Sequence, residues 1–90
     1  MSQKYKVKIW TSPSCPWCMK TKEFFKQNNI KYTDIDVYSD AKAAEEMVQK
    51  SGQRGVPVID IDGKIIVGYD VPALKKALKI KWFYWHYLQV

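Results

Sequence analysis

The chain has 90 residues, of which 47% are hydrophobic and 27% charged, and its formal net charge is +6. This length allows one domain with a modest core, and the composition is that of a soluble globular protein without a run of roughly 18 apolar residues that could cross a bilayer. The basic residues are scattered singly, which argues against a nucleic-acid-binding patch and favours a solvated surface or electrostatic steering toward acidic partners.

The N-terminal segment predicts a first strand. Residues 5–10 alternate between polar and apolar side chains and end in the apolar pair Ile9-Trp10, a pattern typical of a strand. Residues 1–8 contain no apolar core and do not match a signal peptide, so we expect a cytoplasmic protein. In that reducing compartment, a lone pair of neighbouring cysteines is more often catalytic than structural.

Both cysteines stand in Cys15-Pro16-Trp17-Cys18, at the start of a helix predicted over about 16–28. Pro16 suits the first helical position, where no N–H group is missed. One helical turn brings the Cα atoms of the two cysteines to roughly 5.5 Å, a separation that a disulfide can close. Free N–H groups and the helix dipole at this end favour the thiolate form of Cys15, the form that attacks disulfides.

Other uses of a Cys-x-x-Cys pair remain open. A zinc site usually has four ligands, and only His86 remains as a third nitrogen or sulfur donor. A Cu(I) trap and a structural disulfide are further alternatives. The helix-start position favours reversible redox chemistry, in which Cys15 attacks a disulfide and Cys18 resolves the mixed disulfide. Lys20 and Lys22, in the following turns, add positive potential.

A second strand and a second helix follow. Residues 31–37 are rich in β-forming side chains, and a helix over about 40–51 is capped by Ser39 or Asp40 and ended by Gly52. The inner stripe of this helix would consist of Ala44, Met47, Val48 and Ser51.

The next segment predicts a hairpin and a last helix. Residues 56–61 and 64–67 are β-rich runs joined by Asp62-Gly63, a strong hairpin signal. Asp70 can cap a final helix with an apolar stripe. That stripe consists of Val71, Leu74 and Leu78. The predicted order is β-α-β-α-β-β-α, an α/β fold whose first β-α-β unit is parallel and right-handed.

The C-terminal residues break this pattern because aromatic side chains occur on every side of any helix they could form. We therefore place the domain at residues 1–79 and a separate aromatic tail at residues 80–90. The tail is interpreted as a helical extension packed on the domain, with a dimer contact, a membrane-surface anchor, a partner-binding adaptor or a non-native segment as alternatives. Apart from contacts made by this tail, we expect a monomer.

Three motifs in this order resemble the glutaredoxin family of the thioredoxin superfamily. They are Cys15-Pro16-Trp17-Cys18, Gly55-Val56-Pro57 and Gly68-Tyr69-Asp70. The likeness covers residues 5–79 and implies a thioredoxin-like fold with a four-stranded mixed sheet and three helices. It also implies a cis peptide bond before Pro57, since X–Pro bonds lose most of the trans preference.

The resemblance further implies a thiol–disulfide oxidoreductase with a redox-active Cys15–Cys18 disulfide, glutathione as co-substrate and no metal. Its partners would be disulfide-containing or glutathionylated proteins and a reductase system. Arg54 resembles the basic residue that meets the glycine carboxylate of glutathione, and residues 68–70 resemble the turn that receives the γ-glutamyl end. The backbone of Val56 would pair with an extended peptide or glutathione. The residues implied to bind substrate or glutathione are Ser12, Pro16, Trp17, Arg54, Val56, Pro57, Gly68, Tyr69 and Asp70.

Three departures from the family pattern weaken the inference of glutathione binding without affecting the dithiol chemistry. Ser12 stands where many glutaredoxins have a lysine, Gly55 replaces the usual threonine, and Val67 replaces the first glycine of a common pair. Residues 67–70 also resemble the turn of small redoxins that serve ribonucleotide reductase and are reduced by thioredoxin reductase. A further alternative is an iron–sulfur carrier, in which the Cys15 thiolates of two subunits and glutathione hold a 2Fe–2S cluster.

Overall fold

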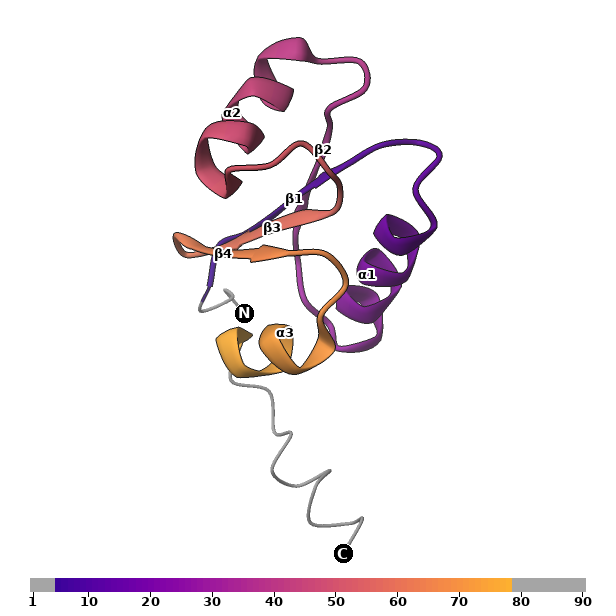
Figure 1. Cartoon of the computed structure of the whole chain (residues 1–90). Helices are drawn as coiled ribbons and strands as arrows, with labels where there is room; N and C mark the ends of the chain where they lie inside the picture. Colours follow the sequence, from indigo (N-terminus) through magenta and orange to yellow (C-terminus); the bar gives the residue numbers. More distant parts are fainter. Residues whose placement is uncertain (1–4, 79–90) are drawn as a thin grey trace, which may run out of the picture.

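The computed structural model describes residues 5–78 and confirms the predicted order of elements (Figure 1). The elements are β1 (Val7–Thr11), α1 (Pro16–Gln27), β2 (Thr33–Asp36), α2 (Ala41–Ser51), β3 (Val58–Ile61), β4 (Lys64–Val67) and α3 (Val71–Leu78). None of these helices within residues 5–78 is long and apolar enough to cross a lipid bilayer. The proposed tail and the domain limit at residue 79 lie outside the described residues.

The four strands form one mixed sheet in the order β2-β1-β3-β4. Strand β1 pairs in parallel with β2 and antiparallel with β3, and β3 and β4 form the predicted hairpin. Helix α2 covers one face of the sheet, whereas α1 and α3 lie on the other (Figure 1). Because β1 is a central strand, the loop that leaves its C-terminal end enters α1 over the middle of the sheet.

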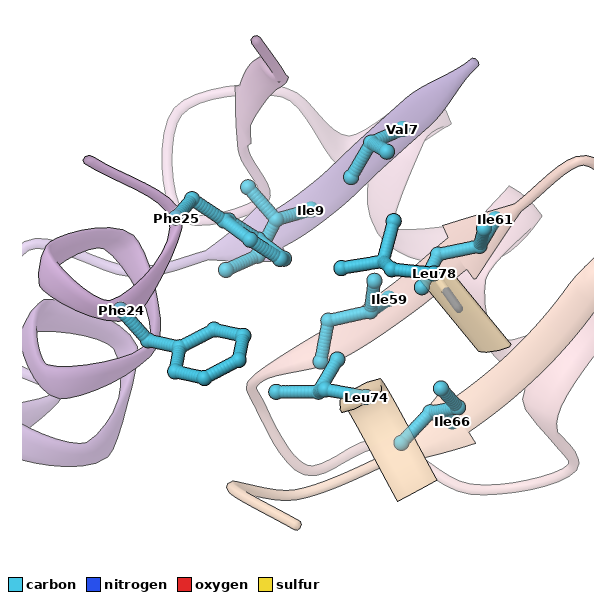
Figure 2. Packing of buried hydrophobic residues seen from close by; sticks show 9 residues of the cluster. All are labelled: Val7, Ile9, Phe24, Phe25, Ile59, Ile61, Ile66, Leu74 and Leu78. Atoms are coloured by element: carbon cyan, nitrogen blue, oxygen red, sulfur yellow. The ribbon is translucent and has the colours of Figure 1, made fainter. Parts of the chain in front are cut away.

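Alternation along the strands divides the core between the two faces. On the side of α1 and α3, nine buried residues form one cluster (Figure 2). They are Val7, Ile9, Phe24, Phe25, Ile59, Ile61, Ile66, Leu74 and Leu78. On the side of α2, a smaller cluster consists of Trp10, Ala43, Met47 and Val58. Each large apolar side chain stabilises the folded state by roughly 1.5–3 kcal/mol when it is fully buried. The larger cluster therefore holds α1 against the sheet.

The first three strands are shorter than or shifted from the predictions, whereas the fourth has the predicted bounds, Lys64–Val67. The first strand continues to Thr11, whose carbonyl accepts a hydrogen bond from the N–H of Val37 at 2.9 Å. The second strand is limited to Thr33–Asp36, the residues that pair with β1. The third begins at Val58, since Pro57 has no N–H to give to a ladder.

Helix α2 confirms the predicted caps and corrects the predicted stripe. The carboxylate of Asp40 accepts the N–H groups of Lys42 and Ala43, both at 3.1 Å, and Gly52 ends the helix with a left-handed φ of 75°. The buried residues are Ala43 and Met47, one turn apart, rather than Ala44. Met47 is buried as predicted, and Ala44, Val48 and Ser51 are half-buried, so the correction is limited to Ala43, which the rotation of the helix on the sheet brings into the core.

Candidate active site

Cys15 occupies the N-cap of α1, and Pro16 follows in the first turn, as predicted. The backbone of Cys15 is extended, with φ −104° and ψ 107°, and its sulfur accepts a hydrogen bond from the N–H of Cys18 at 3.1 Å. Proline has no N–H group and so leaves no donor unpaired at the first helical position. The free N–H group of Cys18 points to the sulfur of Cys15. The geometry is that of an anion-binding helix start, with Cys15 Sγ in the anion position.

A second loop approaches Cys15 from the opposite side. The Sγ atom of Cys15 lies 3.7 Å from the carbonyl oxygen of Val56, which accepts its hydrogen bond. The Val56–Pro57 peptide bond is cis, which confirms that prediction. The carbonyl of Pro57 in turn accepts the N–H of Gly68 at 2.8 Å. One hydrogen bond from the Cys15 thiol and one between backbone groups therefore connect the three family motifs, which lie far apart in the sequence.

Cys18 lies deeper than Cys15, with 1% of its surface exposed against 9%. The pKa of Cys18 is raised to about 12, first by burial and then by the hydrogen bond and charge of Cys15, although the Ser12 backbone and the positive charge of Lys22 act to lower it. At neutral pH Cys18 is therefore a protonated thiol. Both cysteines are free thiols.

A shallow groove of about 270 Å³ opens beside the cysteines. Its lining residues are Trp17, Val56, Pro57, Gly68 and Tyr69. The rings of Trp17 and Tyr69 are stacked, with centroids 5.9 Å apart and planes at 25°, although 55% of Trp17 remains exposed. Five of the predicted binding residues thus line one groove, and the stacking of two of them was not predicted. An apolar floor with aromatic walls suits an extended peptide-like ligand.

The remaining predicted binding residues do not line this groove. Arg54 and Asp70 are exposed, and Ser12 is half-buried. The carboxylate of Asp70 accepts the N–H of Ala73 at 3.2 Å, so it caps α3 as predicted. The carbonyl of Ser12 accepts the N–H of Cys15 at 3.3 Å and shapes the turn into α1.

The loop before Val56 shows why glycine is accommodated at position 55. The side-chain amide of Gln53 accepts the N–H of Gly55 at 3.0 Å and donates to its carbonyl at 2.8 Å. A Cβ atom at position 55 would lie 3.0 Å from the Gln53 oxygen, closer than such contacts normally are. Gln53 and Gly55 therefore fit each other, and a threonine there would displace the Gln53 side chain.

A basic surface continues from the groove along α1. The ammonium of Lys20 lies 5.8 Å from the centroid of the Trp17 ring, and Met19 is 65% exposed. A hollow of about 580 Å³ on this side is lined by Pro16, Met19, Lys20, Lys22, Glu23 and Lys26. Met19 was missed by the sequence analysis, since an apolar residue in a helix normally predicts burial. Positive potential near the motif agrees with the contribution expected from Lys20 and Lys22.

A polar network beneath the cysteines was also missed. Asp34 of β2 accepts hydrogen bonds from the Thr11 hydroxyl at 2.6 Å and from the Lys22 ammonium at 2.8 Å. Partial burial alone would raise the pKa of Asp34, but these two hydrogen bonds outweigh it and the pKa is lowered. The alternation of residues 31–37 could have placed Asp34 on one face of its strand. It could not have identified Lys22 as the ion-pair partner, because that pairing depends on how α1 crosses the sheet.

The sequence is similar to glutaredoxins. The glutaredoxin family model matches residues 7–66. An uncharacterized glutaredoxin-like 8.6 kDa protein of the rubredoxin operon of Clostridium pasteurianum is 49% identical over 73 residues, which make up 81% of this chain and 97% of that protein. Glutaredoxin 3 of Escherichia coli strain K12 is 33% identical over 64 residues, covering 71% of this chain and 77% of that protein.

Solved structures agree with the fold. The thioredoxin-like protein BC3987 superposes with a TM-score of 0.76 at 33% identity, covering 80% of this chain and 99% of that one. The glutaredoxin of Archaeoglobus fulgidus superposes with a TM-score of 0.75 at 26% identity, covering 83% of this chain and 87% of that one. The thioredoxin-like fold expected from the sequence is thereby confirmed.

Proposed function

This chain belongs to the glutaredoxin family, and from that membership we propose that it is a thiol–disulfide oxidoreductase with Cys15 as the attacking and Cys18 as the resolving residue. The observation that carries the proposal is the asymmetry of the pair. The sulfur of Cys15 caps α1 beside the groove, whereas Cys18 is buried and protonated. A nucleophile must be reached by the substrate, while a resolving thiol acts only inside the mixed disulfide.

In the first step, the Cys15 thiolate attacks one sulfur of a substrate disulfide. The new bond joins Cys15 Sγ to that sulfur, the substrate disulfide breaks, and the departing thiolate takes a proton from water. The hydrogen bond from the N–H of Cys18, at 3.1 Å, stabilises negative charge on Cys15 before the attack. The product is a mixed disulfide beside the groove.

In the second step, Cys18 loses its proton and attacks Cys15 Sγ. The bond between Cys15 and the substrate breaks, the substrate leaves as a thiol, and the Cys15–Cys18 disulfide forms. Two electrons have then passed from the protein to the substrate. Because the two cysteines lie three residues apart at a helix start, their spacing suits a disulfide.

Glutathione is proposed as the reductant that reopens this disulfide. The groove beside Cys15 supports the proposal, since the Val56 backbone lies 3.7 Å from the sulfur at one of its walls. Arg54 and Asp70 are exposed and lie within two residues of groove residues in the sequence, and they are proposed to meet the glycine carboxylate and the γ-glutamyl ammonium. The reaction fits the reducing cytoplasm, where glutathione is abundant.

A second candidate is a redoxin reduced by thioredoxin reductase. Gly55 favours it, because Gln53 forms two hydrogen bonds to the backbone where glutaredoxins usually carry a threonine. Ser12 supports it too, since many glutaredoxins have a lysine there, and Ser12 gives the site no positive charge. Both departures reduce the number of groups that can hold glutathione while leaving the dithiol intact.

A coupled NADPH assay separates the two candidates. One reaction contains glutathione and glutathione reductase, and the other contains thioredoxin reductase, each with the same protein disulfide as substrate. We expect rapid NADPH oxidation with glutathione. Oxidation only with thioredoxin reductase would favour the second candidate. A protein that is inactive in both, or a Cys15→Ser variant as active as the wild type, would contradict the oxidoreductase function.

A further inference from the structure

The second step has an energetic obstacle, which is the proton on Cys18. Burial raises the pKa of this thiol far above neutral, to about 12 in the dithiol state. Part of that rise comes from Cys15, through a hydrogen bond and its charge. Once Cys15 is bonded to the substrate it carries no charge, so its contribution disappears, but the burial remains. The groups that oppose the burial are the Ser12 backbone and the ammonium of Lys22.

Lys22 is placed to act on Cys18. It follows Cys18 by four residues in α1, and side chains at this spacing lie on the same face of a helix. Its ammonium turns toward the sheet, where it donates to Asp34 at 2.8 Å, and only 28% of the side chain is exposed. The Lys22 pKa is raised, first by this hydrogen bond with Asp34, and so the side chain keeps its charge.

Asp34 is fixed in turn by the sheet. Its second carboxylate oxygen accepts the hydroxyl of Thr11 at 2.6 Å, and Thr11 is 3% exposed. Lys22 is therefore held by residues of two neighbouring strands, β1 and β2, which pair in parallel next to Thr11 and Asp34. The Lys22–Asp34 pair is partly exposed, but the hydrogen bonds of Asp34 to Lys22 and Thr11 restrict the motion that an unpaired surface lysine would have. One helix and two strands thereby hold the positive charge of Lys22 on the helix face that carries Cys18.

We propose that Lys22, held in place by Asp34 and Thr11, stabilises the thiolate of Cys18 as it forms and thereby sets the rate at which the mixed disulfide releases its substrate. The proposal rests on the proposed function and assigns a group to its second step. Cys18 gives its proton to water, its electron pair forms the bond to Cys15 Sγ, and the substrate sulfur leaves with the pair of the broken bond. Lys22 remains protonated throughout.

Other titratable groups near Lys22 and Cys18 could contribute to the pH dependence of the second step. Cys15 adjoins Cys18 at the start of α1 and is uncharged in the mixed disulfide. Tyr32, which precedes β2, acts on Lys22, and Asp34 stays ionised in the neutral and alkaline range. The alkaline dependence of the second step therefore follows Cys18.

The experiment uses dithiobis(nitrobenzoate), an aromatic disulfide that releases a coloured thiol. One equivalent is mixed in a stopped-flow instrument with the fully reduced protein. The first release of colour reports the attack by Cys15, and the second reports the displacement of the aromatic thiol by Cys18. Both phases are recorded from pH 6 to 9 for the wild type and for Lys22→Met, Lys22→Arg and Lys26→Met. The last variant is the matched control, since Lys26 lies one turn farther along α1.

We expect Lys22→Met to slow the second phase by about threefold throughout the pH range, because loss of the positive charge raises the pKa of Cys18 and lowers the fraction of thiolate. The slowing is smaller than tenfold because a more basic thiolate is also a better nucleophile, with a Brønsted coefficient of about 0.4–0.5. The first phase should change less than the second. Lys22→Arg, which keeps the charge, should restore the second phase, and Lys26→Met should leave both phases unchanged.

Two results would overturn the proposal. One is a second phase that is the same in Lys22→Met as in the wild type. The other is an equal slowing of both phases, which would indicate a general structural defect or a field acting on both sulfurs alike. Failure of the proposed function has a different signature, because the wild-type protein would then lack a rapid first phase, and the inference would fail with it.

Discussion

The two sulfurs of the motif, three residues apart, lie in opposite surroundings. Cys15 borders a groove with aromatic walls and contacts backbone groups, namely the N–H of Cys18 and the carbonyl of Val56. Cys18 is buried, and the positive charge that acts on it belongs to Lys22, which is held by Asp34 and, through Asp34, by Thr11. The two cysteines of one motif therefore have separable functions. The groove side selects and holds the substrate, whereas the sheet side governs how quickly the substrate leaves.

Removing either sulfur gives the largest expected effect and separates the two sides most directly. Cys15→Ser should reduce all thiol transfer to the background rate, because no nucleophile is left beside the groove. Cys18→Ser should retain the reduction of glutathionylated peptides, which glutathione can complete, but lose the reduction of protein disulfides. Both activities are measured with purified variants of equal thermal stability. Equal loss of both reactions in the two variants would show that the two sides are not separable.

Alkaline pH should lower the free energy of unfolding through the buried thiol of Cys18. The folded protein holds the proton of Cys18 up to a pKa of about 12, whereas the unfolded chain releases it near 9.0. The folded state then binds more protons, so stability is full below pH 9 and falls as the pH rises toward 12. Between pH 8 and 10 the free energy of unfolding of the reduced protein should fall by on the order of 1 kcal/mol more than that of Cys18→Ser.

This pH effect is measured by urea unfolding with a phosphine reductant present, so that both cysteines remain thiols. Because the lysines and tyrosines are the same in the two proteins, their titration cancels in the difference. A wild type and a Cys18→Ser variant that lose stability in parallel between pH 8 and 10 would mean that the thiol is not shielded from water in solution.

On the groove side, Tyr69→Ala should weaken substrate binding without affecting the sulfur chemistry. The stacked pair of Trp17 and Tyr69 forms one wall, and an aromatic pair contributes about 0.5–1.5 kcal/mol beyond its buried area. KM for a glutathionylated peptide should therefore rise about threefold to tenfold, with kcat nearly unchanged. Tyr38→Ala is the matched control, because Tyr38 is 83% exposed and does not line the groove. A KM that rises equally in both variants would show that the stacked pair of Trp17 and Tyr69 does not bind the substrate.

The smallest expected effect concerns Asp70, at the edge of the groove. Asp70→Ala should lower the free energy of unfolding by about 1 kcal/mol, because the N–H of Ala73 loses its cap, whereas Asp70→Ser keeps a capping oxygen. Both variants should raise KM for glutathione about twofold to fivefold if the carboxylate meets the γ-glutamyl ammonium. Should KM stay at the wild-type value in Asp70→Ser, the residue serves α3 alone.

Much of the fold followed from local signals. Asp62-Gly63 predicted the hairpin, and both residues have positive φ, which is what a tight connection of two strands requires. Asp40 and Gly52 bounded α2 correctly, since capping depends on residues next to one another in the chain. The start of α1 at Pro16, with Cys15 as its cap, was predictable for the same reason.

Contacts between elements were the part that local signals could not supply. Local residue patterns determined the order of the elements, the caps of α1 and α2 and the end of α1 that carries the two thiols, because these depend on backbone preferences within a few residues. The starts of the first three strands were not determined in this way, since each begins later than predicted. Only the tertiary structure decided that Trp17 stacks on Tyr69, that Lys22 reaches Asp34, and that Ala43 rather than Ala44 is buried. Each of these depends on the rotation and crossing of packed elements, which the shapes of distant side chains settle together.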